Sequence, residues 1–332
     1  MSQQETVIIT GASAGVGRAT AHRFAQSGAR VGLIARDPDA LAEVVQEVER
    51  LGGEALALPA DVSDAAAVFA AADKAAEAWG PPDIWINDAM ATVFSPVERI
   101  EPAEFRRVTD VTYLGCVHGT MAALRHMRPA GGGAIVQVGS ALAYRGIPLQ
   151  AAYCGAKHAI RGFTNSLRAE LIHERAGIHV SIVELPAVNT PQFDWARVHV
   201  ERQPRPMGRI YAPQAAADAI WRAAHGSERE YWLGRTTLLT IVGNMIAPGY
   251  LDRRLARSAV KGQETRQPVG AHREDNLFAP VAGPHRTEGS FGAKAHRRAV
   301  LLPGPGVRMG AVIGGALAFL GAGVALGRSL RS

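Results

Sequence analysis

A glycine-rich turn near the start of the chain is the feature that most constrains its fold. Residues 7–10 form a short apolar run, residues 10–17 spell Thr-Gly-Ala-Ser-Ala-Gly-Val-Gly, and residues 18–26 follow as an amphipathic stretch. A second β-rich run occupies residues 31–35. A strand, a glycine turn, a helix and a strand within about 30 residues is the setting in which such a turn binds a dinucleotide at a helix N-terminus. The alternative, a merely flexible loop, fits this setting less well.

Apolar and amphipathic stretches continue to alternate along the chain. We expect strands at residues 54–60, 84–87, 134–138, 179–184 and 230–233, helices at residues 39–51, 102–127 and 151–175, and a helix that Ser63 caps and that runs to Trp79. Repeated strand–helix units predict an α/β fold with a doubly wound parallel sheet (a Rossmann fold), followed by a C-terminal extension. Ligands bind beyond the carboxyl ends of the strands in such sheets. The segments that follow predicted strands, and that we expect along one rim, are residues 11–17, Asp61, Asn87, Ser140 and Pro186.

The residue after the second strand helps to distinguish NAD from NADP. An acidic side chain there accepts a hydrogen bond from the ribose 2′-hydroxyl, whereas an arginine accommodates a 2′-phosphate. The predicted strand ends at Ala35 and Arg36 follows, so we predict NADP(H) as the cofactor. Because Asp37 is adjacent, an arginine that only faces solvent from the loop remains the alternative.

Tyr153 and Lys157 are four residues apart in a predicted helix, which places both side chains on one face. A fixed ammonium beside a phenol favours the phenolate, so we expect Lys157 to lower the pKa of Tyr153 from its usual value of about 10 toward neutrality. Ser140 lies thirteen residues upstream, where a predicted buried strand ends, and could hold a substrate oxygen. The alternative is an ordinary surface pair, and only the rest of the chain favours a catalytic one.

Taken together, these motifs resemble the short-chain dehydrogenase/reductase family, in its single-domain branch, over about residues 5–235. The pattern Thr-Gly-x-x-x-Gly-x-Gly at residues 10–17 is similar to the cofactor loop of that family. The Asp61-Val62 pair is similar to its adenine-contacting pair, and residues 186–190 are similar to the segment that covers the nicotinamide.

Ser140, Tyr153 and Lys157 match the catalytic residues of this family with the usual spacing. The resemblance implies that Tyr153 is the general acid and base, that Lys157 binds the nicotinamide ribose and lowers the tyrosine pKa, and that Ser140 holds the carbonyl or hydroxyl. The cofactor-binding residues that it implies are Gly11, Ser13, Gly15, Val16, Gly17, Arg36, Asp61, Val62, Asn87, Tyr153, Lys157, Pro186, Val188 and Thr190.

The chain departs from the family pattern in three places. The Asn-Asn-Ala-Gly stretch of the family is here Asn-Asp-Ala-Met at residues 87–90, which puts Met90 near the cofactor path. Thr112 stands where the family has a proton-relay asparagine, so we keep Thr112 as a candidate catalytic residue whose relay role is in doubt. The usual Pro-Gly after the sixth strand is Pro-Ala at residues 186–187.

Residues 191–213 show no clear periodicity and fall where the family has its substrate lid. This segment carries Phe193, Trp195, Met207 and Tyr211, so it is either an apolar pocket wall or a surface loop with a few anchoring aromatics. An apolar wall would favour a lipophilic substrate. Tyr144 lacks a lysine four residues on, and we expect it to line the substrate pocket rather than to act as the acid.

The positive charge of the chain is concentrated in its tail. The chain has a formal charge of +6, but residues 252–332 carry 13 Lys and Arg against 5 Asp and Glu, which leaves residues 1–251 slightly acidic. This distribution excludes nucleic acid as the main partner. The two cysteines and the scattered histidines show no metal or disulfide spacing, so we expect no metal, and a reducing compartment. No basic and apolar leader precedes the first strand, so we expect no secretory targeting.

We divide the chain into a catalytic domain (residues 1–251), a basic flexible linker (252–308) and a candidate transmembrane helix (309–327). The last segment has about 19 residues without a charge, just long enough for a bilayer core of about 30 Å, and two small-x-x-x-small spacings. A helix that docks on the enzyme or on another copy is the alternative. We expect a cytoplasmic catalytic domain, and we favour its anchoring to a membrane through residues 309–327.

The function that we expect is interconversion of an alcohol and a ketone or aldehyde by hydride transfer with NADP(H). A small, apolar carbonyl or alcohol would be the partner molecule, and a homo-oligomer is left open. The rival hypothesis is a non-catalytic NADP-binding sensor or membrane scaffold, which the Met90 and Thr112 departures favour. A third possibility keeps the fold but changes the chemistry to epimerisation or dehydration with a tightly held cofactor.

Overall fold

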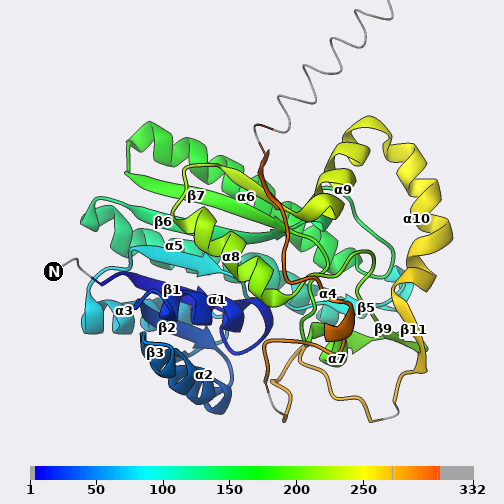
Figure 1. The fold of residues 1–332 in the computed structure, drawn as a ribbon, viewed down its shortest axis with the longest axis horizontal. Helices are drawn as coiled ribbons and strands as arrows, with labels where there is room; N and C mark the ends of the chain where they lie inside the picture. Colours follow the sequence, from blue (N-terminus) through cyan, green and yellow to red (C-terminus); the bar gives the residue numbers. More distant parts are fainter. Residues whose placement is uncertain (1–3, 271, 284, 305, 307–332) are drawn as a thin grey trace, which may run out of the picture.

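The computed structural model describes residues 4–270, 272–283, 285–304 and 306. Its centre is an eight-stranded sheet in the order β12-β10-β7-β6-β4-β1-β2-β3 (Figure 1). The strands are β1 (Thr6–Thr10), β2 (Arg30–Ala35), β3 (Glu54–Pro59), β4 (Ile84–Asn87), β6 (Gly133–Ser140), β7 (Ile178–Leu185), β10 (Glu230–Leu233) and β12 (Leu301–Pro303). All neighbours pair in parallel except β12, which is antiparallel to β10. The predicted doubly wound sheet is confirmed.

Helices cover both faces of the sheet (Figure 1). One face packs against α1 (Gly15–Ala25), α2 (Pro38–Arg50) and α8 (Pro213–Ala224), and the other against α3 (Ala65–Trp79), α4 (Pro102–Thr109), α5 (Gly115–Ala130) and α6 (Ala151–Glu174). Successive strand side chains point to opposite faces, so Val7 and Ile9 enter the first core and Ile8 enters the second. A strand buried on both faces must be apolar throughout, which explains the uninterrupted hydrophobic runs.

Two predicted helices differ in detail from the structure. The helix expected to begin at Ser63 is capped by Asp64, whose carboxylate accepts hydrogen bonds from the backbone of Ala66 and Ala67. The helix expected over residues 102–127 consists of α4 and α5, joined by a π-helical turn at Asp110–Leu114. The aspartate cap and the π-helical turn both depend on local hydrogen bonds, which apolar periodicity does not reveal.

The chain between β7 and α8 crosses the carboxyl edge of the sheet in short pieces. These are α7 (Gln192–Trp195), β8 (Arg197–Val198) and β9 (Arg202–Pro204), of which β8 pairs with β5 (Val93–Phe94) and β9 pairs with β11 (Glu264–Pro268). After β10, the helices α9 (Gly234–Ile246) and α10 (Pro248–Gly262) stand beside this edge (Figure 1).

The C-terminal extension differs from the expected mobile linker over residues 252–308. Helix α10 runs through the expected boundary at residue 251, β11 pairs with β9, and β12 extends the main sheet. Leu277 is fully buried. A few buried apolar side chains and long-range backbone pairing fix this segment against the rest of the fold. Neither produces a periodic pattern in a basic, polar sequence, so the sequence predicts a linker.

The candidate transmembrane helix over residues 309–327 lies outside the described residues. Within the part of the chain that the structure describes, no helix has the length and apolar character needed to cross a membrane.

Candidate active site

A cleft of about 600 Å³ runs along the carboxyl edge of the parallel strands, a size typical of small-molecule and cofactor sites. Thirteen of the residues expected at the site line it: Gly11, Ser13, Gly15, Val16, Arg36, Asp61, Val62, Ser140, Tyr153, Lys157, Pro186, Val188 and Thr190. The parallel order of the strands brings these loops together, because every strand ends at the same edge.

The glycine turn forms a close-packed cradle at the N-terminus of α1. Gly11 has φ of +73°, and a Cβ on Gly17 would lie 2.2 Å from the carbonyl oxygen of Gly11. No side chain fits between the turn and the helix, so the turn lies close against the N-terminus of α1. In this structure the Gly15 N–H donates to the carbonyl of Arg286 and the Gly17 N–H to the Asp88 carboxylate. A close-packed glycine turn at a helix N-terminus is the setting that binds the pyrophosphate of a dinucleotide.

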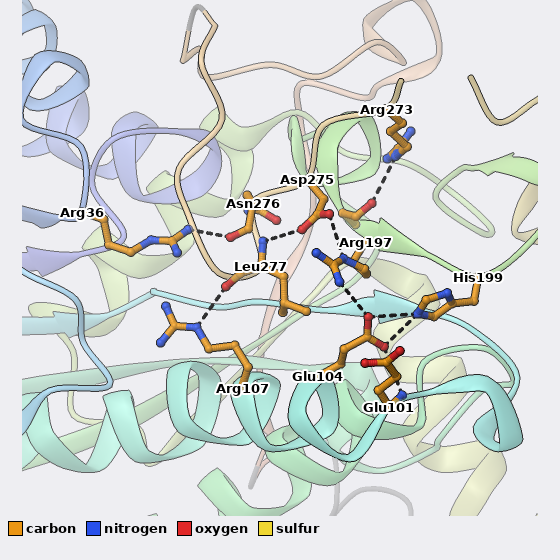
Figure 2. Close-up of polar contacts among 11 residues, drawn as sticks. Arg36, Glu101, Glu104, Arg107, Arg197, His199, Arg273, Asp275, Asn276 and Leu277 are labelled. Atoms are coloured by element: carbon orange, nitrogen blue, oxygen red, sulfur yellow. Dashed lines mark hydrogen bonds and ion pairs between the residues drawn. The ribbon is translucent and has the colours of Figure 1, made fainter. Parts of the chain in front are cut away.

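Arg36 reaches into the same cleft from the end of β2. Its Nη2 donates to the carbonyl oxygen of Asn276 at 2.6 Å (Figure 2). Its Nη1 is buried and has no hydrogen-bond partner among the described residues, which is costly for a charged donor. A 2′-phosphate would supply the missing acceptor, so the residues present fit an adenine dinucleotide that carries one.

Ser140, Tyr153 and Lys157 face one another across the cleft. Ser140 is the last residue of β6, Tyr153 and Lys157 lie in the first turns of α6, and the hydroxyl groups of Ser140 and Tyr153 are hydrogen-bonded. The Lys157 Nζ donates to the carbonyl oxygen of Val138 at 2.6 Å and lies 5.6 Å from the centroid of the Tyr153 ring. The three groups thus share one site, as their spacing predicts.

The expectation that Lys157 lowers the pKa of Tyr153 is not met. Burial raises the pKa of Tyr153 above its usual value, because it penalises the phenolate, and the hydrogen bond with Ser140 opposes this only in part. Lys157 is itself buried, which lowers its pKa. Tyr153 is therefore a protonated phenol at neutral pH in this structure, the form that donates a proton.

Two expected site residues, Asn87 and Thr112, do not line the cleft and instead form hydrogen bonds behind it. The Asn87 amide donates to Thr120 and Gln137 and accepts from Trp85 within a buried network. The Thr112 hydroxyl accepts from the backbone N–H of Ala91 and donates to its carbonyl, each at 3.0 Å. Because this hydroxyl is committed to the loop after β4, we assign Thr112 no proton-transfer role.

Asp88 is a site residue whose importance the sequence did not reveal. Its carboxyl group lines the cleft and accepts from the backbone N–H of Gly17, inside the glycine cradle. Burial raises the pKa of Asp88 to about 7, while the Lys157 ammonium and the Gly17 hydrogen bond act in the opposite direction. A carboxyl group that titrates near neutrality thus stands where the nucleotide phosphates would lie.

This position predicts a pH-dependent affinity for dinucleotides. Asp88 is neutral below pH 7 and charged above it, so we expect the affinity for NADPH to fall by about tenfold as pH rises from 6 to 8, because the carboxylate repels the pyrophosphate. An Asp88→Asn variant should bind more tightly than wild type above pH 7 and lose most of this dependence. Titration of NADPH fluorescence across the pH range measures both, and identical profiles for the two proteins would contradict the assignment.

The segment after β7 forms an apolar wall of the cleft. Phe193, Trp195 and Met207 line it, together with Leu239 and Leu251 from α9 and α10. Of the two interpretations of residues 191–213, the pocket wall is thus the one that the structure supports.

Two other tyrosines considered for this wall, Tyr144 and Tyr211, do not line the cleft. Tyr211 is buried away from the cleft and pairs with Val188. Tyr144, expected to line the substrate pocket, is not among the lining residues, because its hydroxyl donates to Glu230 and the Arg161 guanidinium covers its ring.

One group of lining residues that the sequence did not indicate lies in the C-terminal extension after residue 270. They are Asn276, Leu277, Pro280, Val281 and His285. No local pattern marks them, because their partners are distant in sequence: Leu277 accepts from Arg107, 170 positions away, and Asn276 from Arg36, 240 positions away. Within the described ranges, no group of three or more His, Cys, Asp and Glu side chains could hold a metal ion.

Comparison with known proteins gives consistent matches. The family profile described as short chain dehydrogenase matches residues 5–198. The uncharacterized oxidoreductase YxnA of Bacillus subtilis is 32% identical over 85% of this chain and 80% of its own length. The 3beta-hydroxysteroid dehydrogenase 1 of Eggerthella lenta is 34% identical over 74% of this chain and 95% of its own length. The crystal structure of a 3-ketoacyl-ACP reductase from Sinorhizobium meliloti superposes with a TM-score of 0.60 at 29% identity, over 66% of this chain and 91% of that one.

Proposed function

Because this chain belongs to the short-chain dehydrogenase family, we propose that it is an NADP(H)-dependent oxidoreductase that interconverts an alcohol and a ketone or aldehyde. The observation that carries the proposal is the meeting of Ser140, Tyr153 and Lys157 in the cleft that begins at the glycine cradle. The relatives named as a hydroxysteroid dehydrogenase and a ketoacyl reductase support the same class of reaction.

The nicotinamide cofactor, when bound, supplies or accepts the hydride. The protein residues then manage the oxygen of the substrate. Ser140 donates a hydrogen bond to the carbonyl oxygen, and Tyr153 donates the proton that converts it to a hydroxyl. The raised pKa of Tyr153 keeps this proton in place at neutral pH. Lys157, whose Nζ lies 5.6 Å from the centroid of the Tyr153 ring, would bind the nicotinamide ribose.

The walls of the cleft favour an apolar substrate. Beyond Tyr153, the lining side chains include Phe193, Met207, Leu239 and Leu251. Such a wall binds a hydrocarbon framework through burial of apolar area and leaves the carbonyl to Ser140 and Tyr153 for orientation. We therefore propose a lipophilic ketone, aldehyde or alcohol.

A screen of carbonyl and alcohol compounds with NADPH and NADP⁺ tests this function, with NADH and NAD⁺ as controls. We expect at least one apolar ketone to be reduced with one NADPH consumed for each alcohol formed. Turnover without net consumption of cofactor would point to epimerisation or dehydration. Tight NADPH binding without turnover across the panel would favour the sensor or scaffold.

Arg36 provides a prediction on cofactor choice. An Arg36→Ala variant loses a charged donor that the 2′-phosphate would bind, and such bonds contribute about 1.5–3 kcal/mol. We expect NADPH affinity to fall about 10- to 100-fold while NADH affinity stays nearly unchanged. The exposed Arg106 provides the control, since Arg106→Ala removes the same charge away from the cleft. Equal losses for NADPH and NADH in the Arg36 variant would contradict the prediction.

A further inference from the structure

The C-terminal extension crosses the nucleotide end of the cleft in a segment that we call the strap, defined as residues 273–283 and 285–291. Figure 2 shows its first part passing between Arg36 and Arg107 on one side and Arg197 on the other. Five strap residues line the cleft, namely Asn276, Leu277, Pro280, Val281 and His285. The strap is therefore part of the wall of the cleft and not a surface loop.

The walls of the nucleotide site contact the strap through its backbone carbonyl groups. Arg36 donates to Asn276 at 2.6 Å, and Arg107, which also binds Asp61, donates to Leu277 at 3.0 Å. Farther along, the backbone N–H of Gly15 donates to Arg286 at 3.0 Å. In addition, Arg18 donates to the carbonyl of His285 at 2.7 Å. The strap thus contacts the glycine turn, the end of β2 and helix α4.

The opposite side of the strap is fixed to the segment after β7. The Asn276 N–H donates to the carbonyl of Trp195 at 3.0 Å, and Arg197 forms an ion pair with Asp275 at 2.8 Å (Figure 2). Asp194 accepts from Arg286 and from Ser290, each at 2.7 Å. The strap therefore ties the apolar substrate wall to the nucleotide walls.

Leu277 is the apolar strap residue that borders the nucleotide walls. It is fully buried, and it lines the cleft beside Arg36, Asp61 and Val62. Its neighbour Phe278 is 51% exposed and does not line the cleft. An apolar side chain beside Asp61-Val62 suits the face of a purine ring.

We propose that the strap is a wall of the site for the adenosine 2′-phosphate end of the cofactor, in which Leu277 covers the adenosine and the carbonyl of Asn276 orients Arg36. This carbonyl engages Nη2 and leaves Nη1 of the same guanidinium, which has no hydrogen-bond partner among the described residues, to bind the phosphate. The inference rests on the proposed function, since it assigns residues to the cofactor proposed there. It adds to the family's cofactor loop a set of contacts from the C-terminal extension, which lies beyond the matched residues 5–198.

The first test measures binding to the full chain by isothermal calorimetry. The probes are NADPH and adenosine 2′,5′-bisphosphate, with nicotinamide mononucleotide as the probe of the other end. We expect Leu277→Asp to weaken both adenosine probes by about tenfold, because it places a carboxylate beside a phosphate site, and to leave nicotinamide mononucleotide unaffected. The matched control is Phe278→Asp, which adds the same charge outside the cleft and should bind every probe as wild type does. A loss below about threefold in the Leu277 variant, or an equal loss in the control, overturns the proposal.

Leu277→Ala provides the same test without a buried charge, and circular dichroism melting confirms that each variant folds. A milder weakening of the same two probes is expected, because the alanine uncovers part of the adenosine site. Unchanged binding of adenosine 2′,5′-bisphosphate by a folded Leu277→Ala protein counts against the proposal.

The second test uses the wild-type chain and needs no substitution. Trypsin can cut after the exposed Arg286 in the strap and after the exposed Arg266 outside it. If the strap is a wall of the adenosine site, adenosine 2′,5′-bisphosphate should slow the cut after Arg286 by about fivefold or more, because the ligand-bound strap opens less often. The cut after Arg266 should stay unchanged. Faster cutting after Arg286 would show that the nucleotide displaces the strap, and an unchanged rate would show that the two do not meet. Either result overturns the proposal.

These outcomes separate this inference from the proposed function. If wild type reduces carbonyl compounds and the strap variants bind the adenosine probes normally, the proposed function stands and the proposal for the strap is overturned. Selective loss of adenosine probes in the Leu277 variants, in a protein that turns over no substrate, would keep the strap and overturn the catalytic function. A wild-type protein that binds none of the nucleotides would overturn both.

Discussion

Replacing Tyr153 by phenylalanine is expected to lower kcat for carbonyl reduction by about a thousandfold, within the range of about 10² to 10⁴ that a positioned general acid contributes. The change removes only the hydroxyl that, in the proposed reaction, gives its proton to the substrate oxygen, while the ring remains to fill its place on α6. NADPH should therefore bind the variant nearly as tightly as it binds wild type. Steady-state kinetics with a ketone found in the screen, together with a fluorescence titration of NADPH, measure the two quantities.

Tyr144→Phe is the matched control for this experiment. It removes the same group from a tyrosine nine positions earlier, whose hydroxyl donates to Glu230 and which does not line the cleft. We expect this variant to retain most of its kcat once its folding has been verified by melting. Undiminished turnover by Tyr153→Phe, or a comparable collapse in Tyr144→Phe with the fold intact, would remove Tyr153 from the role of general acid.

The second large effect is expected from Gly17→Ala. A Cβ at this position would lie 2.2 Å from the carbonyl oxygen of Gly11 and 3.0 Å from the carboxylate of Asp88. Neither the turn nor the helix can keep its place, so the cradle must open. We expect NADPH affinity to fall by about a hundredfold or more, and stability to fall by about 1–3 kcal/mol, which is typical of an overpacked site.

Gly162→Ala tests whether these losses come from the close approach rather than from substitution of a helical glycine. Gly162 lies in α6, and nothing stands within 4 Å of an added Cβ. Since alanine is the better helix former, this variant should bind NADPH normally and be slightly more stable, by at most about 1 kcal/mol. If Gly17→Ala retained wild-type NADPH affinity in the same titration, the glycine cradle would have no part in nucleotide binding.

The alternation of strands and helices could be predicted because it rests on short-range patterns. The glycine turn lies between β1 and α1, and each parallel strand of the main sheet is apolar enough to be recognised alone, whereas the three-residue β12 was not predicted. Tyr153 and Lys157 could be paired for the same reason, since one helix sets their spacing. Ser140 joined them through a general property of parallel sheets, namely that the strand ends share one edge.

Short-range sequence patterns do not reveal the electrostatic properties of the site. The pKa of Tyr153 depends on how deeply the phenol is buried, and burial outweighs the hydrogen bond with Ser140, which acts to lower it. Asp88 differs from the family residue by one atom type, yet burial raises its pKa to about 7, against the Gly17 hydrogen bond and the Lys157 charge. Thr112 is occupied by the backbone of Ala91, a partner 21 positions away.

By itself, then, the sequence determined the class of sheet, the glycine turn and the Ser140, Tyr153 and Lys157 set, because each depends on residues close in the chain or on strand order. Only the tertiary structure decided that the basic extension after residue 251 returns to the nucleotide site. Arg36 and Asn276 are 240 positions apart, and Arg18 and His285 are 267 apart. Contacts of that separation form between backbone carbonyls and distant arginines, and a carbonyl group has the same chemistry in every residue, so no side-chain pattern announces it.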